Sequence, residues 1–222
     1  MIKIFNYELY RLVRDKSFII ISFGILFLNY AIFSGKSISM EEYIRKDFLT
    51  ISLSTLYIAL FIGKEFEDKK ITYQLLAGNS RTKILLSKSV IVILIIEFQL
   101  FLFPISQMIL TRRFTLWSPS ENRFHISLIL MGIYLTSLCI LIISVVKKSA
   151  MSVGILILFY LLSMLAMNNK NIGEIAIHFF PLGIGQLIAL NQIGLVRGMA
   201  LILIWTAAQM IIAILLFLKV DL

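Results

Sequence analysis

The chain contains 222 residues, of which 59% are hydrophobic and 15% are charged, and it carries a formal net charge of +9 at pH 7. Soluble domains are typically about half apolar and about a quarter charged, so one globular core of this size cannot bury the apolar excess. The long continuous apolar runs predict an all-α integral membrane protein rather than a β-barrel, whose segments are short and alternating. Positive charge is typical of cytoplasmic loops in membrane proteins, so we expect no nucleic-acid partner.

Few residues have the types or the spacing that covalent chemistry requires. Cys139 is the single cysteine, and His125 and His178 are far apart in the sequence, so we expect neither a disulfide nor a metal site. Residues 41–45 (Glu-Glu-Tyr-Ile-Arg) are similar to the Glu-Glu-x-x-x-Arg motif of intramembrane prenyl-protein proteases, but their spacing is one residue short. Both histidines also fall in predicted outer segments, so we expect no catalytic residue.

Residues 1–16 are predicted to form a helix that lies on the membrane surface. One face of this helix is apolar and the opposite face is basic. The apolar face contains Ile2, Phe5, Leu9, Leu12 and Val13, and the basic face contains Lys3, Arg11 and Arg14. A simple positively charged flank of the first span is the alternative. No small-x-small cleavage site follows the first apolar run, so we expect that run to remain as a membrane anchor.

Six apolar runs are long enough, with their flanks, to cross a bilayer. They cover residues 17–33, 48–63, 89–110, 126–146, 150–167 and 199–218. Six spans place both termini on one side of the membrane. Basic residues concentrate in the N-terminal segment, in residues 64–88 and in the turn at Lys147-Lys148, which predicts that this side is cytoplasmic. We therefore expect one transmembrane domain over residues 1–222, multi-pass in the cell membrane.

The most heavily charged part of the chain is the stretch 64–88, between the second and third spans. Gly78 suits the left-handed position that ends a helix, and Ser80 suits the N-cap of the next helix. The stretch therefore predicts a short helix over residues 65–77, a sharp turn, and a third span that begins at Arg81 in water. Apolar residues on two sides of the short helix indicate that it is sandwiched between the membrane domain and a second protein. A solvated loop whose apolar residues fold back on the bilayer is the alternative.

This stretch resembles the first cytoplasmic loop of ABC-2 type transporter permeases. The matching residues, in order, are Glu65-Phe66, Thr72, Leu75-Leu76, Ser80-Arg81, Ile84 and Lys88. Ile71 and Asn79 stand where the family commonly has Gly and Pro. The resemblance extends to a surface helix, six spans, a long segment between the fifth and sixth spans, and an acidic end at Asp221.

The resemblance implies the permease subunit of an ATP-driven ABC exporter, working with a second permease (an identical copy or a sister chain) and two ATPase subunits. The helix over residues 65–77 would be the coupling helix that enters a cleft of the ATPase. The expected contact residues are Glu65, Phe66, Glu67, Asp68, Lys69, Lys70, Thr72, Tyr73, Leu75, Leu76, Ser80 and Arg81. The chain has no G-x-x-x-x-G-K-[ST] loop. We therefore expect ATP and Mg in the partner, and neither a cofactor nor enzymatic activity in this chain.

A carboxylate lies within the predicted third span, at Glu97. A charged side chain at the bilayer centre costs roughly 2.5–3.5 kcal/mol or more, so we expect Glu97 to face protein or water. It would mark the substrate path or an interface between permeases, with Gln99 and Gln107 helping to hydrate that region. A hydrogen-bonded or protonated structural glutamate is the alternative.

Residues 168–198 are too apolar for a free loop and too interrupted for a span. We expect two short helices that dip into the outer leaflet and are hinged at residues 181–185, although an amphipathic cap on the outer surface is the alternative. In the resembled family such a segment forms the outer gate, which would here contain Phe179, Phe180, Pro181, Gly183 and Gly185.

The substrate class is the property that the sequence constrains least. Short outer loops exclude a large external receptor domain. The Ile- and Lys-rich composition resembles that of low-GC Gram-positive bacteria, in which small permeases of this kind often export antimicrobial peptides or confer resistance to them. We therefore expect a hydrophobic or amphipathic substrate. A membrane carrier that works without ATP, or an immunity or interaction protein, is the alternative function.

Overall fold

The computed structural model describes residues 2–33, 40–111, 119–169 and 173–218, and within these ranges it contains ten helices and no strand. The all-α prediction is therefore confirmed. The helices are α1 (Ile2–Arg14), α2 (Lys16–Phe33), α3 (Met40–Glu67), α4 (Lys70–Leu76), α5 (Arg81–Thr111), α6 (Pro119–Val146), α7 (Ser149–Asn168), α8 (Gly173–Phe179), α9 (Pro181–Ala189) and α10 (Leu195–Leu218).

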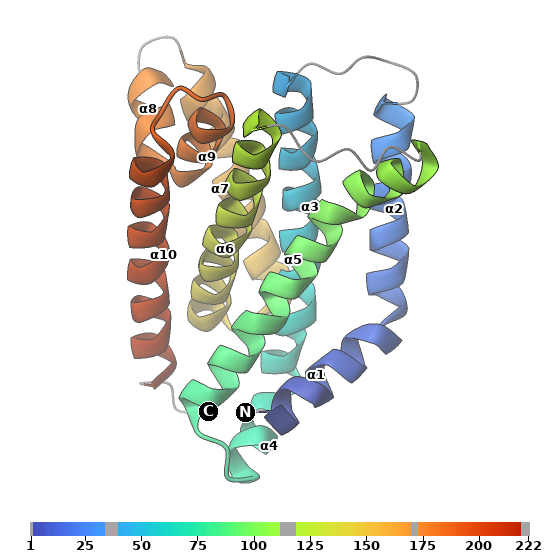
Figure 1. Ribbon diagram of the computed structural model, residues 1–222. Helices are drawn as coiled ribbons and strands as arrows, with labels where there is room; N and C mark the ends of the chain where they lie inside the picture. The colour runs from blue at the N-terminus through green and yellow to red at the C-terminus, as the bar shows by residue number, and fades with distance from the viewer. Residues whose placement is uncertain (1, 34–39, 112–118, 170–172, 219–222) are drawn as a thin grey trace.

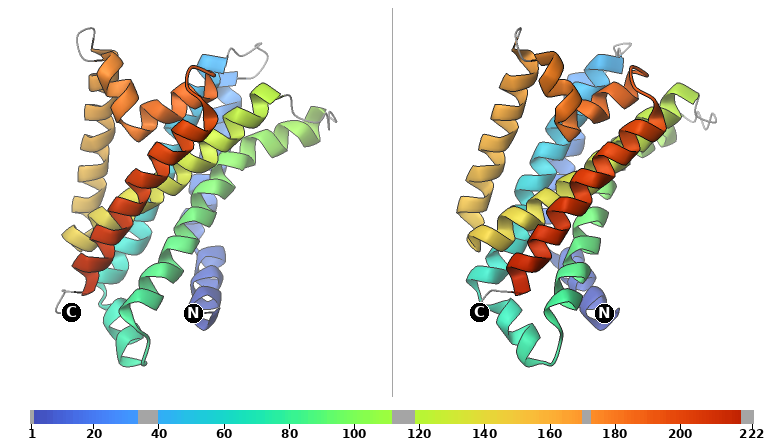
Figure 2. Two further views of the ribbon diagram at one scale, coloured as in Figure 1. Left: turned by 60° about the vertical axis from the view of Figure 1, so that its left-hand side comes forward. Right: turned by 90° about the vertical axis from the view of Figure 1, so that its left-hand side faces the viewer.

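The long helices form one bundle, as Figure 1 shows. The short helix α4 lies at one end of this bundle, next to the start of α1 and the end of α10, whereas α8 and α9 lie at the opposite end. The two views of Figure 2 show α6 and α10 side by side along most of their length. The bundle therefore has two distinct ends, which are joined by helices long enough to reach from one to the other.

Within the described ranges, four helices are long and apolar enough to cross a membrane: α5, α6, α7 and α10. They contain the predicted third to sixth spans. The predicted first span corresponds to α2, an apolar helix that is shorter, and the predicted second span lies inside α3, whose 28 residues include a polar first part. The structure is thus consistent with a membrane protein that has at least these four spans.

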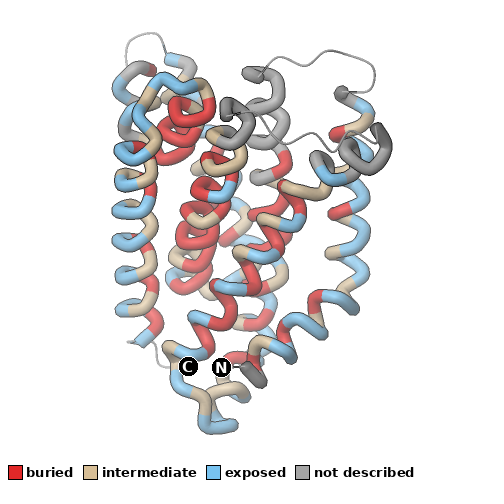
Figure 3. The backbone as a smooth tube through the Cα atoms, viewed as in Figure 1, coloured by how far each residue is buried: buried red, intermediate tan, exposed pale blue. Residues whose placement is uncertain are grey.

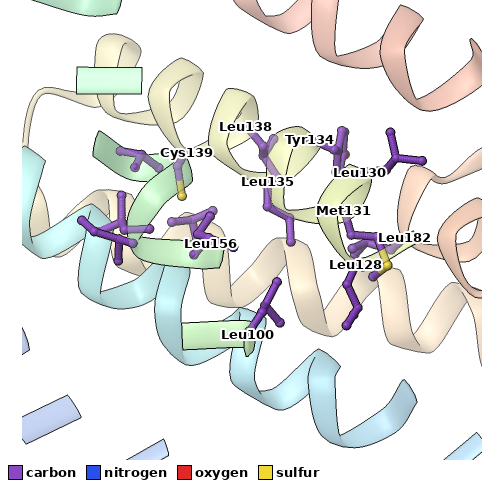
Figure 4. Close-up of a cluster of buried hydrophobic side chains, with 14 of the residues drawn as sticks. Leu100, Leu128, Leu130, Met131, Tyr134, Leu135, Leu138, Cys139, Leu156 and Leu182 are labelled. Carbon is purple, nitrogen blue, oxygen red and sulfur yellow. The ribbon is translucent and has the colours of Figure 1, made fainter. Parts of the chain in front are cut away.

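The buried residues of the bundle centre on α6 (Figure 3). Its Leu128, Met131, Leu135 and Cys139 are almost completely covered by neighbouring helices, and Figure 4 shows Leu100 of α5 in the same cluster. In contrast, α2, α7 and α10 expose many large apolar side chains on their outer faces. An exposed apolar surface of this extent is expected where lipid, rather than water, covers the protein.

Polar side chains join the helices inside the bundle. Gln99 of α5 donates to Ser22 of α2 over 3.2 Å, and Ser137 of α6 donates to Gln209 of α10 over 2.6 Å. The hydroxyls of Thr55 in α3 and Tyr160 in α7 are 2.6 Å apart. Such hydrogen bonds between helices contribute about 0.6 kcal/mol each in membrane proteins, so their main effect is to fix which faces of the helices meet.

Two of the differences from the predicted helix boundaries fall in segments that were expected to be functional. Residues 65–77 do not form one helix: α3 continues to Glu67, Lys69 adopts a left-handed conformation (φ 54°), and α4 begins at Lys70. Residues 168–198 do form two short helices, as predicted. However, their junction is at Phe180, and the predicted hinge residues 181–185 are the first turns of α9 because Pro181 favours a helix N-terminus.

Candidate functional site

A group of charged side chains is buried at the α4 end of the bundle, and it joins three helices. Glu8 of α1, Glu65 of α3 and Lys88 of α5 are only 1%, 1% and 4% exposed. The Lys88 Nζ lies 2.9 Å from Glu8 Oε1 and also contacts a carboxylate oxygen of Glu65. Arg11 of α1 pairs with Glu65 and lies 3.4 Å from Glu8 Oε2. We call Glu8, Arg11, Glu65 and Lys88 the buried ion cluster.

The buried ion cluster contains two acids and two bases, so its charges balance. Gln74 of α4 donates a further hydrogen bond to Glu8 over 3.1 Å, which connects α4 to the cluster. Burial by itself would raise the pKa of Glu8, but the charges of Lys88 and Arg11 and the hydrogen bonds from Lys88 and Gln74 outweigh it. The net effect holds the pKa of Glu8 below its ordinary value of 4.5, so Glu8 is ionised at neutral pH.

Two further charged residues of the stretch 64–88 stabilise helix ends. The Glu67 carboxylate accepts hydrogen bonds from the backbone N–H of Ser149 (2.8 Å) and from its hydroxyl (3.0 Å), at the first residue of α7. Arg81 donates to the carbonyls of Phe217 and Leu218, each over 3.1 Å, at the end of α10. An acid at a helix N-terminus and a base at a C-terminus both complement the helix dipole.

Helix α4 has one buried and one exposed side. Ile71 is fully buried and, with the half-buried Leu75, packs on a cluster that includes Phe217. On the outer side, Tyr73 is 67% exposed and Leu76 is 79% exposed. Because these two side chains are three residues apart, they neighbour each other on the same helical surface. We call Tyr73 and Leu76, together with the exposed Lys69 and Lys70 beside them, the α4 surface.

The turn after α4 contains the two predicted helix-end residues, Gly78 at the end of α4 and Ser80 at the start of α5. Gly78 is left-handed (φ 84°), and its N–H donates to the carbonyl of Leu75 over 2.9 Å, which closes the end of α4. The Ser80 hydroxyl accepts a hydrogen bond from the N–H of Lys83 over 3.4 Å and thereby caps the start of α5. The roles predicted for Gly78 and Ser80 are confirmed. This ordered turn holds α4 in a fixed position at the end of α5.

The structure separates the predicted contact residues into two groups. Glu65, Glu67 and Arg81 are engaged inside the chain, and Asp68 pairs with Lys70 over 3.1 Å. The exposed group contains Asp68, Lys69, Lys70, Tyr73, Leu76 and Ser80, whereas Phe66, Thr72 and Leu75 are half-buried. Glu65 therefore cannot take part in an external contact without leaving the buried ion cluster.

Three residues at this end were not among the predicted contact residues: Glu8, Arg11 and Lys88. One signal for Glu8 is visible in the sequence, because Ile4, Glu8 and Leu12 repeat at four-residue intervals and form the buried stripe of α1. A carboxylate within such a stripe requires a cationic partner. Its partner Lys88 is 80 residues away along the chain, and no local pattern identifies it.

Of the polar residues predicted along the third span, Glu97 and Gln99 are described, and they contact different helices. The carboxylate of Glu97 lies against Gly132 of α6, where a side-chain carbon added at Gly132 would be 2.5 Å from Glu97 Oε1. Both Glu97 oxygens are covered and have no hydrogen-bond partner among the described residues. Gln99 instead contacts α2 through Ser22. Gln107 lies in α5, but its side chain is outside the described residues, as are those of Glu41, Glu42 and Arg45 in α3.

At the other end, the predicted gate residues surround the junction of α8 and α9. Pro181, Gly183 and Gly185 are buried. Gly183 packs directly on the backbone of Ile177 in α8, and Gly185 packs on Met131 of α6. Phe180 is half-buried between the two helices, and the side chain of Phe179 is outside the described residues. Close packing of small residues fixes α9 against the bundle.

The side chains that could carry chemistry are dispersed through the bundle. Among the residues that the structure describes, no three His, Cys, Asp or Glu side chains lie together as metal ligands would. A comparison with protein-family models finds no match, and neither does a search of curated proteins. The described part of the chain is all-helical, and its long apolar helices are consistent with a membrane protein.

Proposed function

We propose that the chain is the permease subunit of an ATP-driven exporter of the ABC-2 type, with six membrane spans and with the α4 end in the cytoplasm. The observation that carries this proposal is the α4 surface. Tyr73 and Leu76 are large, apolar and exposed, although the adjacent turn and the charges around them belong to the aqueous side. Apolar and aromatic side chains in that setting are typical of a protein-binding site.

Rigid support of the α4 surface favours this proposal over a loop that rests on the bilayer. Ile71 anchors α4 in the bundle, Gln74 joins it to the buried ion cluster, and the Gly78 turn connects it to α5. A partner that pushes on α4 would therefore displace α1, α3 and α5 together. This is the property that a coupling element between an ATPase and a set of membrane helices needs.

In this proposal the partner ATPase binds ATP and Mg, and a second permease, identical or related, completes the transport path. Closure of the two ATPase subunits on ATP would move α4, and the membrane helices would rearrange to release a hydrophobic or amphipathic substrate outward. Residues of α8 and α9 would then form the outer gate. This chain would contribute the path and the coupling but no covalent step.

The test is whether the α4 surface binds an ATPase. The first observation is whether a neighbouring reading frame encodes a lone ATPase domain. The chain is then co-expressed with that ATPase, the complex is purified, and its ATP hydrolysis is measured. The variant Tyr73→Ala/Leu76→Ala is expected to lose the ATPase, because it removes the exposed apolar contact. The matched control Leu9→Ala/Tyr10→Ala changes the same residue types on the exposed side of α1 and is expected to retain it. Retention of the ATPase by the α4 variant would contradict the proposal.

A further inference from the structure

A hollow of about 520 Å³ is lined mainly by residues of α1, α2 and α3. Figure 1 shows where these three helices lie in the bundle. The size of the hollow is within the range of about 300–1,000 Å³ that is usual for small-molecule sites. Its lining includes the basic residues Arg14, Lys64 and Lys70 and the apolar residues Ile21, Leu60 and Phe61. Of these six residues, only Lys70 also belongs to the α4 surface.

The lining of the hollow changes from basic to apolar at the predicted membrane boundary. Arg14 precedes the first predicted span, which begins at residue 17, and Lys64 directly follows the second, which ends at residue 63. Ile21 and Leu60 lie four residues or fewer inside those spans. The hollow therefore has cationic groups at the level of lipid headgroups and apolar walls at the level of the acyl chains.

The cations that face the hollow are available to a ligand. Among the described residues no carboxylate pairs with Arg14 or Lys64, and both side chains are exposed. The Arg14 guanidinium lies over the ring of Tyr10, with its carbon 4.3 Å from the ring centre, which orients it but leaves its N–H groups free to donate. Lys70 is the third cation and shares its charge with Asp68.

Two acids also line the hollow, and both are already engaged. Glu65 belongs to the buried ion cluster, where Arg11 and Lys88 balance it. Asp15 accepts one hydrogen bond from the Tyr57 hydroxyl and another from the N–H of Ser17, each over 2.8 Å. With Arg11, the lining carries four basic and two acidic residues. The hollow is therefore electropositive, and it favours an anionic ligand.

We propose that this hollow binds the phosphate headgroup of one anionic glycerophospholipid. Arg14 and Lys64 would contact the phosphate, and an acyl chain would follow the apolar wall of Ile21 and Leu60 into the bilayer. Basic pockets at the cytoplasmic side of membrane helices suit such headgroups. The proposal requires only that α2 and α3 lie in a membrane, and it is independent of whether an ATPase docks on α4.

The test is native mass spectrometry of the purified full chain, with phosphatidylglycerol and phosphatidylcholine supplied in equal amounts in mild detergent. Wild type is expected to retain one phosphatidylglycerol in preference to phosphatidylcholine. The variant Arg14→Gln/Lys64→Gln is expected to reduce that preference by roughly 25-fold, since each basic residue near an anionic lipid contributes about a factor of five. The charge-preserving variant Arg14→Lys/Lys64→Arg is expected to retain most of it.

The matched control is Lys83→Gln/Lys148→Gln, which removes two exposed charges from the same end of the protein outside the hollow. It is expected to leave the preference unchanged. An equal loss in this control would show a general surface-charge effect and overturn the site. Full retention of the phosphatidylglycerol preference by Arg14→Gln/Lys64→Gln would also overturn the proposed site. A third arm adds inorganic phosphate: displacement of the lipid at millimolar phosphate would mean that the ligand is a soluble anion and not a phospholipid.

Discussion

Individual residues at the α4 end have roles that depend on what surrounds them rather than on their charge. Glu65, Glu67 and Asp68 are close neighbours in the sequence, yet one is buried in an ion cluster, one caps α7 and one forms an exposed ion pair. An exposed pair contributes little, typically about 0–1 kcal/mol. Removal of one partner from a buried pair costs much more, because the remaining charge is left without compensation.

The first prediction concerns Lys88. Its replacement by methionine leaves Glu8 and Glu65 with Arg11 as their only cationic partner. We therefore expect a loss of about 3–5 kcal/mol in the free energy of unfolding. Thermal unfolding in detergent, followed by tryptophan fluorescence, measures the effect. Lys83→Met is the control, because Lys83 is exposed on the same helix and is expected to change little. The double variant Lys88→Met/Glu8→Gln should recover part of the lost stability. If its loss in the free energy of unfolding instead equals the sum of the losses in the two single variants, the two residues are not directly coupled.

The second prediction concerns pH. The pKa of Glu8 is lowered in the folded chain, so Glu8 contributes stability that is complete above its ordinary value of 4.5. That contribution is lost as the pH falls through the folded pKa, because protonation removes the charge that pairs with Lys88. The midpoint of unfolding, measured between pH 7 and pH 3, should therefore decrease below about pH 4.5 in wild type. Glu8→Gln should show a flatter profile, and an identical pH dependence in the two proteins would refute this role.

At the scale of helices, close contacts at glycine fix how α3 and α7 pack. Gly63 lies against the start of α7, where an added side-chain carbon would be 2.6 Å from the Ser149 Cα. This contact brings the end of α3 near enough for Glu67 to bond to Ser149. The glycine and the carboxylate therefore act together. The glycine allows the close approach, and Glu67 accepts hydrogen bonds from the Ser149 N–H and hydroxyl.

The third prediction follows from this contact. Gly63→Ala forces α3 away from the start of α7 and should cost roughly 1–3 kcal/mol in the free energy of unfolding. Gly154→Ala is the matched control, since Gly154 of α7 has open space around it. There, alanine should be neutral or stabilising by up to about 1 kcal/mol, because it favours the helix. Both are measured by thermal unfolding, and similar effects at the two sites would show that the α3–α7 contact is not tight.

At the scale of the whole molecule, the arrangement of the helices defines two ends of different character. One end contains α4, the turn at Gly78, the start of α1 and the end of α10, and the other contains α8 and α9 (Figures 1 and 2). The proposed six spans require these ends to be on opposite sides of the membrane. The basic residues favour the cytoplasm for the α4 end.

The fourth prediction tests this topology. In a Cys139→Ala background, Ser80→Cys and Gln192→Cys place single exposed thiols at the two ends. A membrane-impermeant maleimide applied to intact cells should label Gln192→Cys. It should label Ser80→Cys only after the membrane is permeabilised. Labelling of both variants in intact cells, or of Ser80→Cys alone, would contradict the predicted orientation. A background protein without an introduced thiol serves as the control.

Much of the fold could be predicted because lipid-spanning helices depend on local hydropathy. Residues 150–167 contain no charged side chain and lie within α7. Gly78 marked a turn because its left-handed conformation is easy only for glycine. The extent of α3 was missed for a physical reason. Its polar first residues, from Met40, resemble a loop by hydropathy, but polar residues continue a helix readily once it leaves the membrane.

The candidate site was predicted less well, because its geometry depends on distant parts of the chain. The charged composition of residues 64–88 indicated an aqueous end, but it did not indicate which charges are buried. Glu65 is buried because Arg11 and Lys88 meet it there. Lys69, which breaks the helix in a left-handed conformation, is also unexpected, since that conformation is usually taken by Gly or Asn.

The buried ion cluster also bears on the order in which the chain assembles during synthesis. All four of its members lie within the first 88 residues. The cluster can therefore close once α5 has begun to emerge, before α6 to α10 have been made. The carbonyls at the end of α10 come last, and they reach Arg81 at a site that is already formed. The earlier helices would thus form, at the α4 end, the surface to which the later-synthesised α10 binds.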